Sequence, residues 1–196
     1  MQSLSGDDVV HAPSAGSDPL SGPRVANTVG MVEENAALRI AGELGVPFNV
    51  VECDPALADT AEFCAAYGYE MTDSANAIVV VGKSDPRRYV CCVVLATTRL
   101  DVNGTVRRLL GTKKASFAPA AETAELTGMA IGGVTPFGLP AEVPVWIDAR
   151  VMTRTTIVLG GGTRDCKIVA APQILTAISG ALVLEDLALE PPATSG

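Results

Sequence analysis

Histidine is almost absent from this sequence, and the one that is present, His11, lies in a segment rich in serine, glycine and proline. Mechanisms of the Ser-His-Asp and Cys-His types need an imidazole in the folded site, so the sequence disfavours both. With one histidine and no Cys-x-x-Cys spacing, a zinc site does not follow either, and no Walker or Rossmann phosphate motif is present. We therefore expect a protein that needs no metal and no organic cofactor.

Long apolar runs are missing as well, because the two longest, residues 77–81 and 89–96, are far shorter than the roughly 20 residues of a membrane helix. The first 30 residues lack the basic and then apolar pattern of a secretory signal peptide. The five cysteines form an odd-numbered set that predicts no disulfide framework, and Cys91 and Cys92 fall inside an apolar run. We expect a soluble cytoplasmic protein with reduced thiols and no membrane partner.

Aromatic residues make up only 4% of the chain, whereas 48% of it is hydrophobic, so the core must consist mainly of Val, Ala, Leu and Ile. A length of 196 residues suits one domain with one core. Residues 1–25 are rich in Ser, Gly, Pro and Asp without periodicity, so we interpret them as a mobile tail. We place the domain at residues 26–190 and a second tail at 191–196.

The net charge of −8 is unfavourable for a nucleic-acid surface, because affinity for nucleic acids comes largely from neutralised phosphates. Positive charge nevertheless gathers in two clusters, at residues 83–88 and 107–114. Such runs are usually solvated faces, and we interpret the 83–88 turn in this way. For the 107–114 cluster, a solvated face and a contact with phosphates both remain open, and nothing suggests a DNA partner.

Hydrophobic periodicity predicts an α+β domain. Between Val32 and Leu44 the apolar residues follow helical spacing, and Gly45 ends this helix. The apolar runs 77–81 and 89–97 flank a Gly- and Pro-containing turn and predict a β-hairpin at the centre of the sheet. The other expected helices are 59–67, 102–110, 119–126 and one that starts at Pro172, and the other expected strands are 47–53, 143–147, 155–159 and 168–170. Together they indicate a single domain with one curved, mostly antiparallel mixed sheet surrounded by short helices.

The most unusual backbone chemistry lies in residues 131–140, Ile-Gly-Gly-Val-Thr-Pro-Phe-Gly-Leu-Pro. Three glycines and two prolines exclude a regular helix or central strand, while the apolar residues between them should fold back onto a core. A packed glycine-rich backbone can direct several N–H groups at one ligand. A ligand loop and a tight apolar turn between strands are both consistent with this pattern.

Together with Leu126-Thr127-Gly128, this loop resembles the glycine loop of the YbaK/ProX-type aminoacyl-tRNA deacylases, which include the editing domain inserted in bacterial prolyl-tRNA synthetases. The similarity continues through residues 101–103, 107–118, 145–148 and 160–164. It covers most of the chain between about Val32 and Leu187 and implies the fold of that family.

The resemblance implies a trans-editing hydrolase that removes a small amino acid such as Ala, Cys or Ser from tRNA(Pro). Its partner would be the acceptor end of an aminoacyl-tRNA, and a partnership with an aminoacyl-tRNA synthetase stays open. An alternative is a catalytically impaired module that binds an aminoacyl-tRNA or a nucleotide ligand without hydrolysis.

The resemblance also suggests residues for a catalytic group. Backbone N–H groups of Gly132 and Gly133 could polarise the ester carbonyl, and Thr135 could hydrogen-bond the amino acid or the water. The family's characteristic lysine falls on Asn76, which is neutral but can still donate two hydrogen bonds. Lys167 stands near where many family members carry an acidic residue, so we hypothesise that the cation has moved across the pocket.

A second group is expected to bind the substrate. Ser116 could hydrogen-bond it and Phe137 could bound the pocket, within a loop that also contains Pro136 and Gly138. A turn-stabilising hydroxyl at Ser116 or Thr135, and simple core packing at Phe137, are the alternatives. Phosphate contacts would come from the cationic residues Arg107, Arg108 and Lys113.

Overall fold

The computed structural model describes residues 34–190. The expected tails at 1–25 and 191–196 lie outside the described residues, as do His11 and the start of the first expected helix. No helix in the described range is long and apolar enough to cross a membrane.

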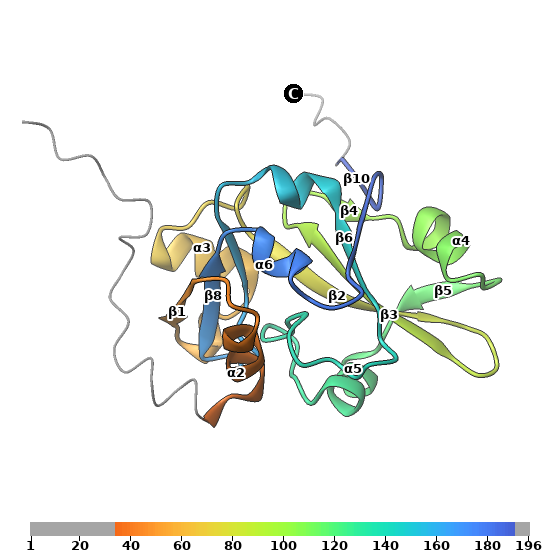
Figure 1. The fold of residues 1–196 in the computed structure, drawn as a ribbon, viewed down its shortest axis with the longest axis horizontal. Helices are drawn as coiled ribbons and strands as arrows, with labels where there is room; N and C mark the ends of the chain where they lie inside the picture. Colours follow the sequence, from red (N-terminus) through yellow and green to blue (C-terminus); the bar gives the residue numbers. More distant parts are fainter. Residues whose placement is uncertain (1–33, 191–196) are drawn as a thin grey trace, which may run out of the picture.

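The largest sheet has five strands in the order β5-β2-β3-β6-β9 (Figure 1). The predicted hairpin is confirmed at its centre as β2 (Ala75–Gly82) and β3 (Arg88–Leu95), paired antiparallel over eight residues. Strand β5 (Ala115–Phe117) adds antiparallel to β2, whereas β6 (Val145–Asp148) and β9 (Leu182–Leu184) add in parallel on the other side. The short β5 and β9 were not predicted, because three residues carry too little periodicity.

Two smaller sheets complete the strands. One has the order β1-β8-β7, from Phe48–Glu52, Cys166–Ala170 and Ile157–Gly160, and the other pairs β4 (Arg99–Leu100) with β10 (Ala188–Leu189). The α+β class is confirmed, but the strands that we expected in a single sheet are divided between two sheets, and the β4–β10 pair was not predicted. The reason is that β7 takes its hydrogen bonds from β8 and meets the segment before β2 at one bridge, Ser74 to Val158.

Four expected helices are present at the sites that their end signals indicated. These are α2 (Ala36–Glu43), α3 (Thr60–Tyr67), α5 (Ala120–Thr127) and α6 (Gln173–Thr176). A 3₁₀ turn η1 (Pro55–Leu57) lies between β1 and α3, and another, η3 (Ala149–Thr153), lies between β6 and β7. Asn35 caps α2 through its side chain, while Gly68 and Gly128 end α3 and α5 in the left-handed conformation.

The expected helix 102–110 is instead a π-helical turn, η2 (Val102–Val106), followed by α4 (Arg107–Leu109). The Asp101 carboxylate accepts hydrogen bonds from the N–H groups of Gly104 and Thr105. A Cβ on Gly104 would lie 2.1 Å from an Asp101 oxygen, so glycine makes room for this cap.

The sheets pack their apolar faces into adjoining clusters. The face of β1, β7 and β8 that α3 covers buries Val51, Val158 and Val169 against Phe63. All five cysteines are buried, and burial raises the pKa of Cys91 to about 12. The sheet face under α3 is the one that carries the candidate site.

Candidate functional site

A cavity of about 440 Å³ lies between the start of α3, the first half of β2, the end of β5 and the first part of the glycine loop. Its walls are mostly apolar, as in ligand pockets generally. Six polar or charged side chains line it: Asp59, Thr60, Ser74, Asn76, Thr123 and Lys167. The cavity therefore brings together residues that are up to 108 positions apart in the chain.

Lys167 is the buried cation of this cavity. Along β8 it alternates onto the same face as Val169, opposite Val51 of β1, and only 5% of it is exposed. Its Nζ donates to the carbonyls of Ala58 (2.5 Å) and Gly132 (2.7 Å) and lies 5.6 Å from the centre of the Phe63 ring. Burial lowers the pKa of Lys167 below its ordinary value.

These two carbonyls leave one N–H of the Lys167 ammonium for a ligand. An ammonium group has three donors, and only two find acceptors in the described chain. A charge-assisted donor in such a poorly solvated place interacts strongly with negative charge. The site can therefore stabilise an anion or a developing oxyanion.

Asn76 also lines the cavity, from the start of β2. Its Oδ1 accepts a hydrogen bond of 2.7 Å from the Thr60 hydroxyl at the start of α3. This contact fixes the amide orientation and leaves the NH₂ group for a ligand. Sequence reasoning missed Thr60, because a threonine at the start of a helix is ordinarily interpreted as part of its cap.

The glycine loop contributes Ile131, Gly132 and Val134 to the cavity, but Gly133 only supports it. The N–H of Gly133, which we expected to polarise the ester, donates to Ala130 O (2.9 Å), and its carbonyl accepts from Gly162 (2.8 Å). A Cβ on Gly133 would lie 2.5 Å from the Thr163 carbonyl. Glycine is required there by close packing of backbone on backbone.

Arg164 joins the glycine loop to the start of α3. Its Nη1 donates to Ile131 O (2.7 Å) and to Asp59 (3.1 Å), and its Nε donates to Pro55 O (3.0 Å). Asp59 consequently occupies the N-cap position of α3 without making a side-chain cap bond. The sequence showed only a glycine-rich turn at this place, and no sequence pattern predicted these three contacts of Arg164.

The second half of the glycine loop turns into the core. Thr135 is fully buried, and its hydroxyl has no hydrogen-bond partner among residues 34–190. Phe137 is 1% exposed and packs in the main core, so core packing accounts for it and it does not bound the cavity as we expected. Gly138 approaches Ile40 of α2. None of these three residues, nor Pro136, lines the cavity.

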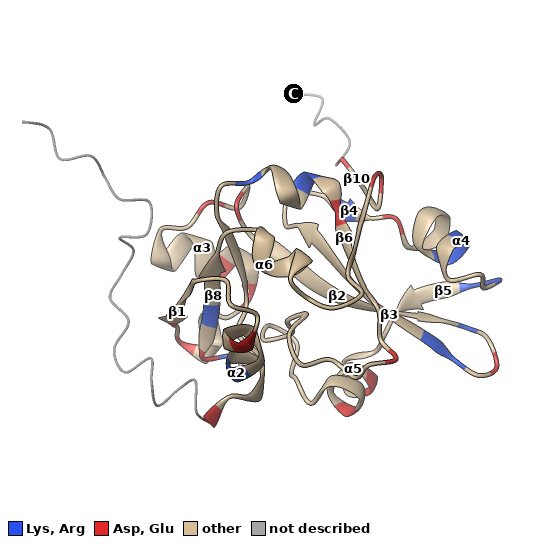
Figure 2. Ribbon diagram, in the orientation of Figure 1, with Lys and Arg blue, Asp and Glu red and all other residues tan. Residues whose placement is uncertain are grey.

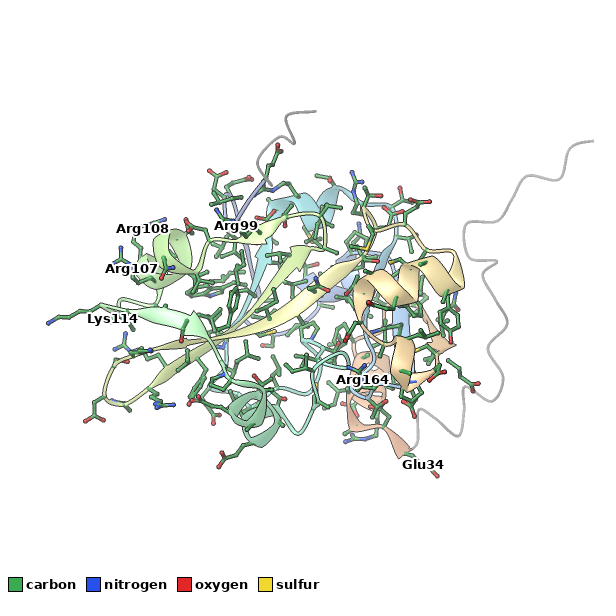
Figure 3. The ribbon with its side chains drawn as sticks, turned by 180° about the vertical axis from the view of Figure 1, so that it is seen from behind. Glu34, Arg99, Arg107, Arg108, Lys114 and Arg164 are labelled. Carbon is green, nitrogen blue, oxygen red and sulfur yellow. The ribbon has the colours of Figure 1, made fainter. Side chains whose placement is uncertain are left out.

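The remaining expected substrate contacts also lie outside the cavity. Ser116 pairs with Val81 in the sheet, and its neighbour Phe117 lines the cavity instead. Arg107 and Arg108 border a separate open hollow beside Asp101, at the end of the molecule where the hairpin turn and β5 meet (Figures 2 and 3). Lys113 follows them on the exposed turn before β5.

Comparison with known proteins matches the sequence to one protein family. The sequence profile of the aminoacyl-tRNA editing domain matches residues 54–177, a range that holds every residue lining the cavity. The uncharacterized protein YwhH of Bacillus subtilis (strain 168) is 27% identical over 139 residues, which are 71% of this chain and 86% of YwhH.

Solved structures share the fold. A candidate trans-editing enzyme for prolyl tRNA synthetase is 28% identical and superposes with a TM-score of 0.67, covering 86% of this chain and all of the other. The hypothetical protein APE2540 superposes with a TM-score of 0.66 at 22% identity, covering 76% of this chain and 95% of its own. At that identity the second likeness concerns the fold alone.

Proposed function

Because the chain belongs to the aminoacyl-tRNA editing domain family, we propose that it hydrolyses the ester that joins a wrongly attached amino acid to the 3′ end of a tRNA. A small amino acid such as Ala, Cys or Ser on tRNA(Pro) is the proposed substrate, in line with the similarity to a candidate trans-editing enzyme for prolyl tRNA synthetase. The observation that carries the proposal is the buried Lys167 ammonium, held by the glycine loop inside a cavity that Asn76 also lines.

Hydrolysis of this ester forms a bond between a water oxygen and the acyl carbon. It breaks the bond between that carbon and the ribose oxygen, which leaves with a proton as a hydroxyl group. Negative charge collects on the carbonyl oxygen in between, so donors that are already oriented lower the barrier. An ester needs no protein nucleophile for this reaction, which agrees with the absence of histidine from residues 34–190.

Two side chains supply such donors. The third N–H of Lys167 is the stronger, because it is charged and almost excluded from solvent. The Asn76 amide, oriented by Thr60, can hold either the carbonyl oxygen or the attacking water. This division of roles keeps our hypothesis that the cation stands across the pocket from the position of the family's lysine.

The test is single-turnover deacylation of tRNA(Pro) charged with Ala, Cys or Ser. Lys167→Met keeps an apolar stem of similar length but removes the charged donor, and we expect its rate to fall by about 100-fold or more. Arg39→Met, on the exposed side of α2, removes one positive charge away from the cavity and should keep the wild-type rate. Equal rates for wild type and Lys167→Met would show that Lys167 plays no part in the chemistry.

Moving the positive charge from β8 to β2 tests an effect on catalysis separately from an effect on folding. Lys167→Asp should be inactive, and adding Asn76→Lys should restore part of the rate by placing the cation on β2. Near-ultraviolet circular dichroism of each variant would show whether its core is packed. Failure of a well-folded double variant to recover would mean that the cation acts only from β8.

A binding module without catalysis is the second candidate function. It is favoured by the neutral Asn76 and by the net charge of −8. Folded wild-type protein that binds a non-hydrolysable amide analogue of alanyl-tRNA, but deacylates none of the three charged tRNAs, would establish this alternative.

A further inference from the structure

Two large apolar side chains are left exposed where the cavity opens. Phe117, the last residue of β5, is 56% exposed, and Ile131, at the start of the glycine loop, is 50% exposed. Both line the cavity, whereas the other large exposed apolar residues of the described chain do not: Leu109, Leu182, Val183 and Leu189. Phe117 is also the only aromatic residue in this exposed set.

The backbone holds Phe117 firmly in this exposed position. Phe117 pairs with Val80 in the sheet, and the next residue, Ala118, donates its N–H to Val79 O (2.9 Å). The ring is therefore presented by a strand and not by a free loop. An aromatic ring kept in water beside a pocket is typical of a surface that binds a ligand.

We propose that Phe117 and Ile131 form a nucleobase subsite that stacks the 3′-terminal base of the aminoacyl-tRNA. This inference rests on the proposed function. The scissile ester is attached to the ribose of the terminal nucleotide. The base of that nucleotide is attached to the same ribose, so it must lie close to the reacting carbon. When the acyl group enters the cavity toward Lys167, the base stays at the opening, and aromatic and apolar side chains are the surfaces on which bases stack.

The strand that carries Phe117 continues this subsite toward positive charge. Lys114 precedes Phe117 by three residues, which is roughly 10 Å along an extended strand. Figure 3 shows Lys114 pointing outward at the same end of the molecule as Arg107 and Arg108. An RNA whose last base stacks on Phe117 can thus place the preceding phosphates near Lys114. Repulsion between these phosphates and the acidic remainder of the protein then weakens binding little.

A double-mutant cycle between protein and RNA tests the subsite. The ligand is an acceptor-stem microhelix of tRNA(Pro) with alanine attached through a 3′-amide, made with either adenine or no base at its 3′ end. Removing the base should weaken binding to the wild type by roughly 5- to 150-fold, the range for one stacked base. The same removal should change binding to Phe117→Ala by less than about twofold, because the stacking partner is already gone.

Two further variants complete this experiment. Phe117→Trp should bind the complete microhelix at least as well as the wild type, and Leu182→Ala, equally exposed but outside the cavity, should behave like the wild type in both arms. Additive losses in the cycle, or no binding of the complete microhelix, would overturn the subsite. If Phe117 and the terminal base are coupled in the cycle but the wild type deacylates none of the charged tRNAs, the subsite is supported and the proposed hydrolysis is rejected.

Discussion

Lys167 combines a positive charge with almost complete burial. Its partners are two neutral carbonyls and the ring of Phe63, and the pKa of its ammonium is lowered chiefly because burial removes water from the charged form. The family resemblance implies an acidic residue near this place in many relatives. Under the proposed function, Lys167 supplies the positive charge of this site and Asn76 supplies a neutral amide.

The pKa of Lys167 predicts how stability depends on pH. Because the folded pKa lies below the ordinary value of 10.5, the unfolded chain binds more protons between these two values. The free energy of unfolding of wild type, measured relative to Lys167→Met, should therefore rise as the pH increases through this window toward 10.5. Urea unfolding of both proteins at several pH values from 7 to 10.5 measures this difference.

Leu182→Ala is the control for this measurement, because it changes no titratable group. Its difference from the wild type should stay constant over the same pH range. A constant difference for Lys167→Met as well would mean that the lysine titrates alike in the folded and unfolded chain.

At the scale of elements, two glycine-rich segments hold the site together by direct backbone contact. Gly133 lies against the Thr163 backbone, and a Cβ on Gly160 would lie 2.3 Å from the carbonyl oxygen of Val134. The N–H of Gly162 donates to the Gly133 carbonyl between them. The loop that carries the carbonyl acceptor of Lys167 is thus positioned by the turn after β7.

We expect Gly133→Ala to lower the free energy of unfolding by about 1–3 kcal/mol, because the new methyl group must displace backbone. Gly42→Ala is the matched control. Gly42 lies in α2 with no atom within 4 Å of the added Cβ, so this change should stabilise the protein by up to about 1 kcal/mol. Urea denaturation measures both, and equal effects of the two substitutions would contradict the packing argument.

At the scale of the molecule, charge is segregated. Seven of the 14 Lys and Arg residues lie at the turn of the β2–β3 hairpin, on α4 and on the turn before β5, while the net charge is −8 (Figure 2). They are Lys83, Arg87, Arg88, Arg107, Arg108, Lys113 and Lys114. Some already have partners, since Arg87 pairs with Glu122 and Arg88 donates to Leu110 O. Arg108, Lys113 and Lys114 make no hydrogen bond or ion pair through their side chains within residues 34–190.

Under the proposed function, this end should contact phosphates of the tRNA. Replacing Arg107, Arg108 and Lys113 together by Gln should weaken binding of tRNA(Pro). It should also reduce the slope of log K against log salt concentration by roughly 0.7–0.9 for each phosphate that is no longer neutralised. Fluorescence anisotropy at several salt concentrations measures this slope. An Arg39→Gln control should leave it unchanged, and an unchanged slope in the triple variant would reject this surface.

The sequence by itself determined the elements whose signals are local. The hairpin β2–β3 follows from two apolar β-branched runs around a turn, and α3 and α5 end at glycines that adopt the left-handed conformation. These signals suffice because they act within a few residues of the chain. They also indicated the α+β class and an irregular loop at residues 131–140, which the family resemblance related to a ligand site.

Only the tertiary structure decided which residues of that loop face the cavity. Ile131, Gly132 and Val134 do, whereas Thr135 and Phe137 turn into the core. It also decided that Lys167 meets Gly132, and that the expected strands form two sheets that meet at the Ser74 bridge. The physical reason is that these contacts join segments tens of residues apart. Their geometry depends on how strands pair and pack, which no local pattern specifies.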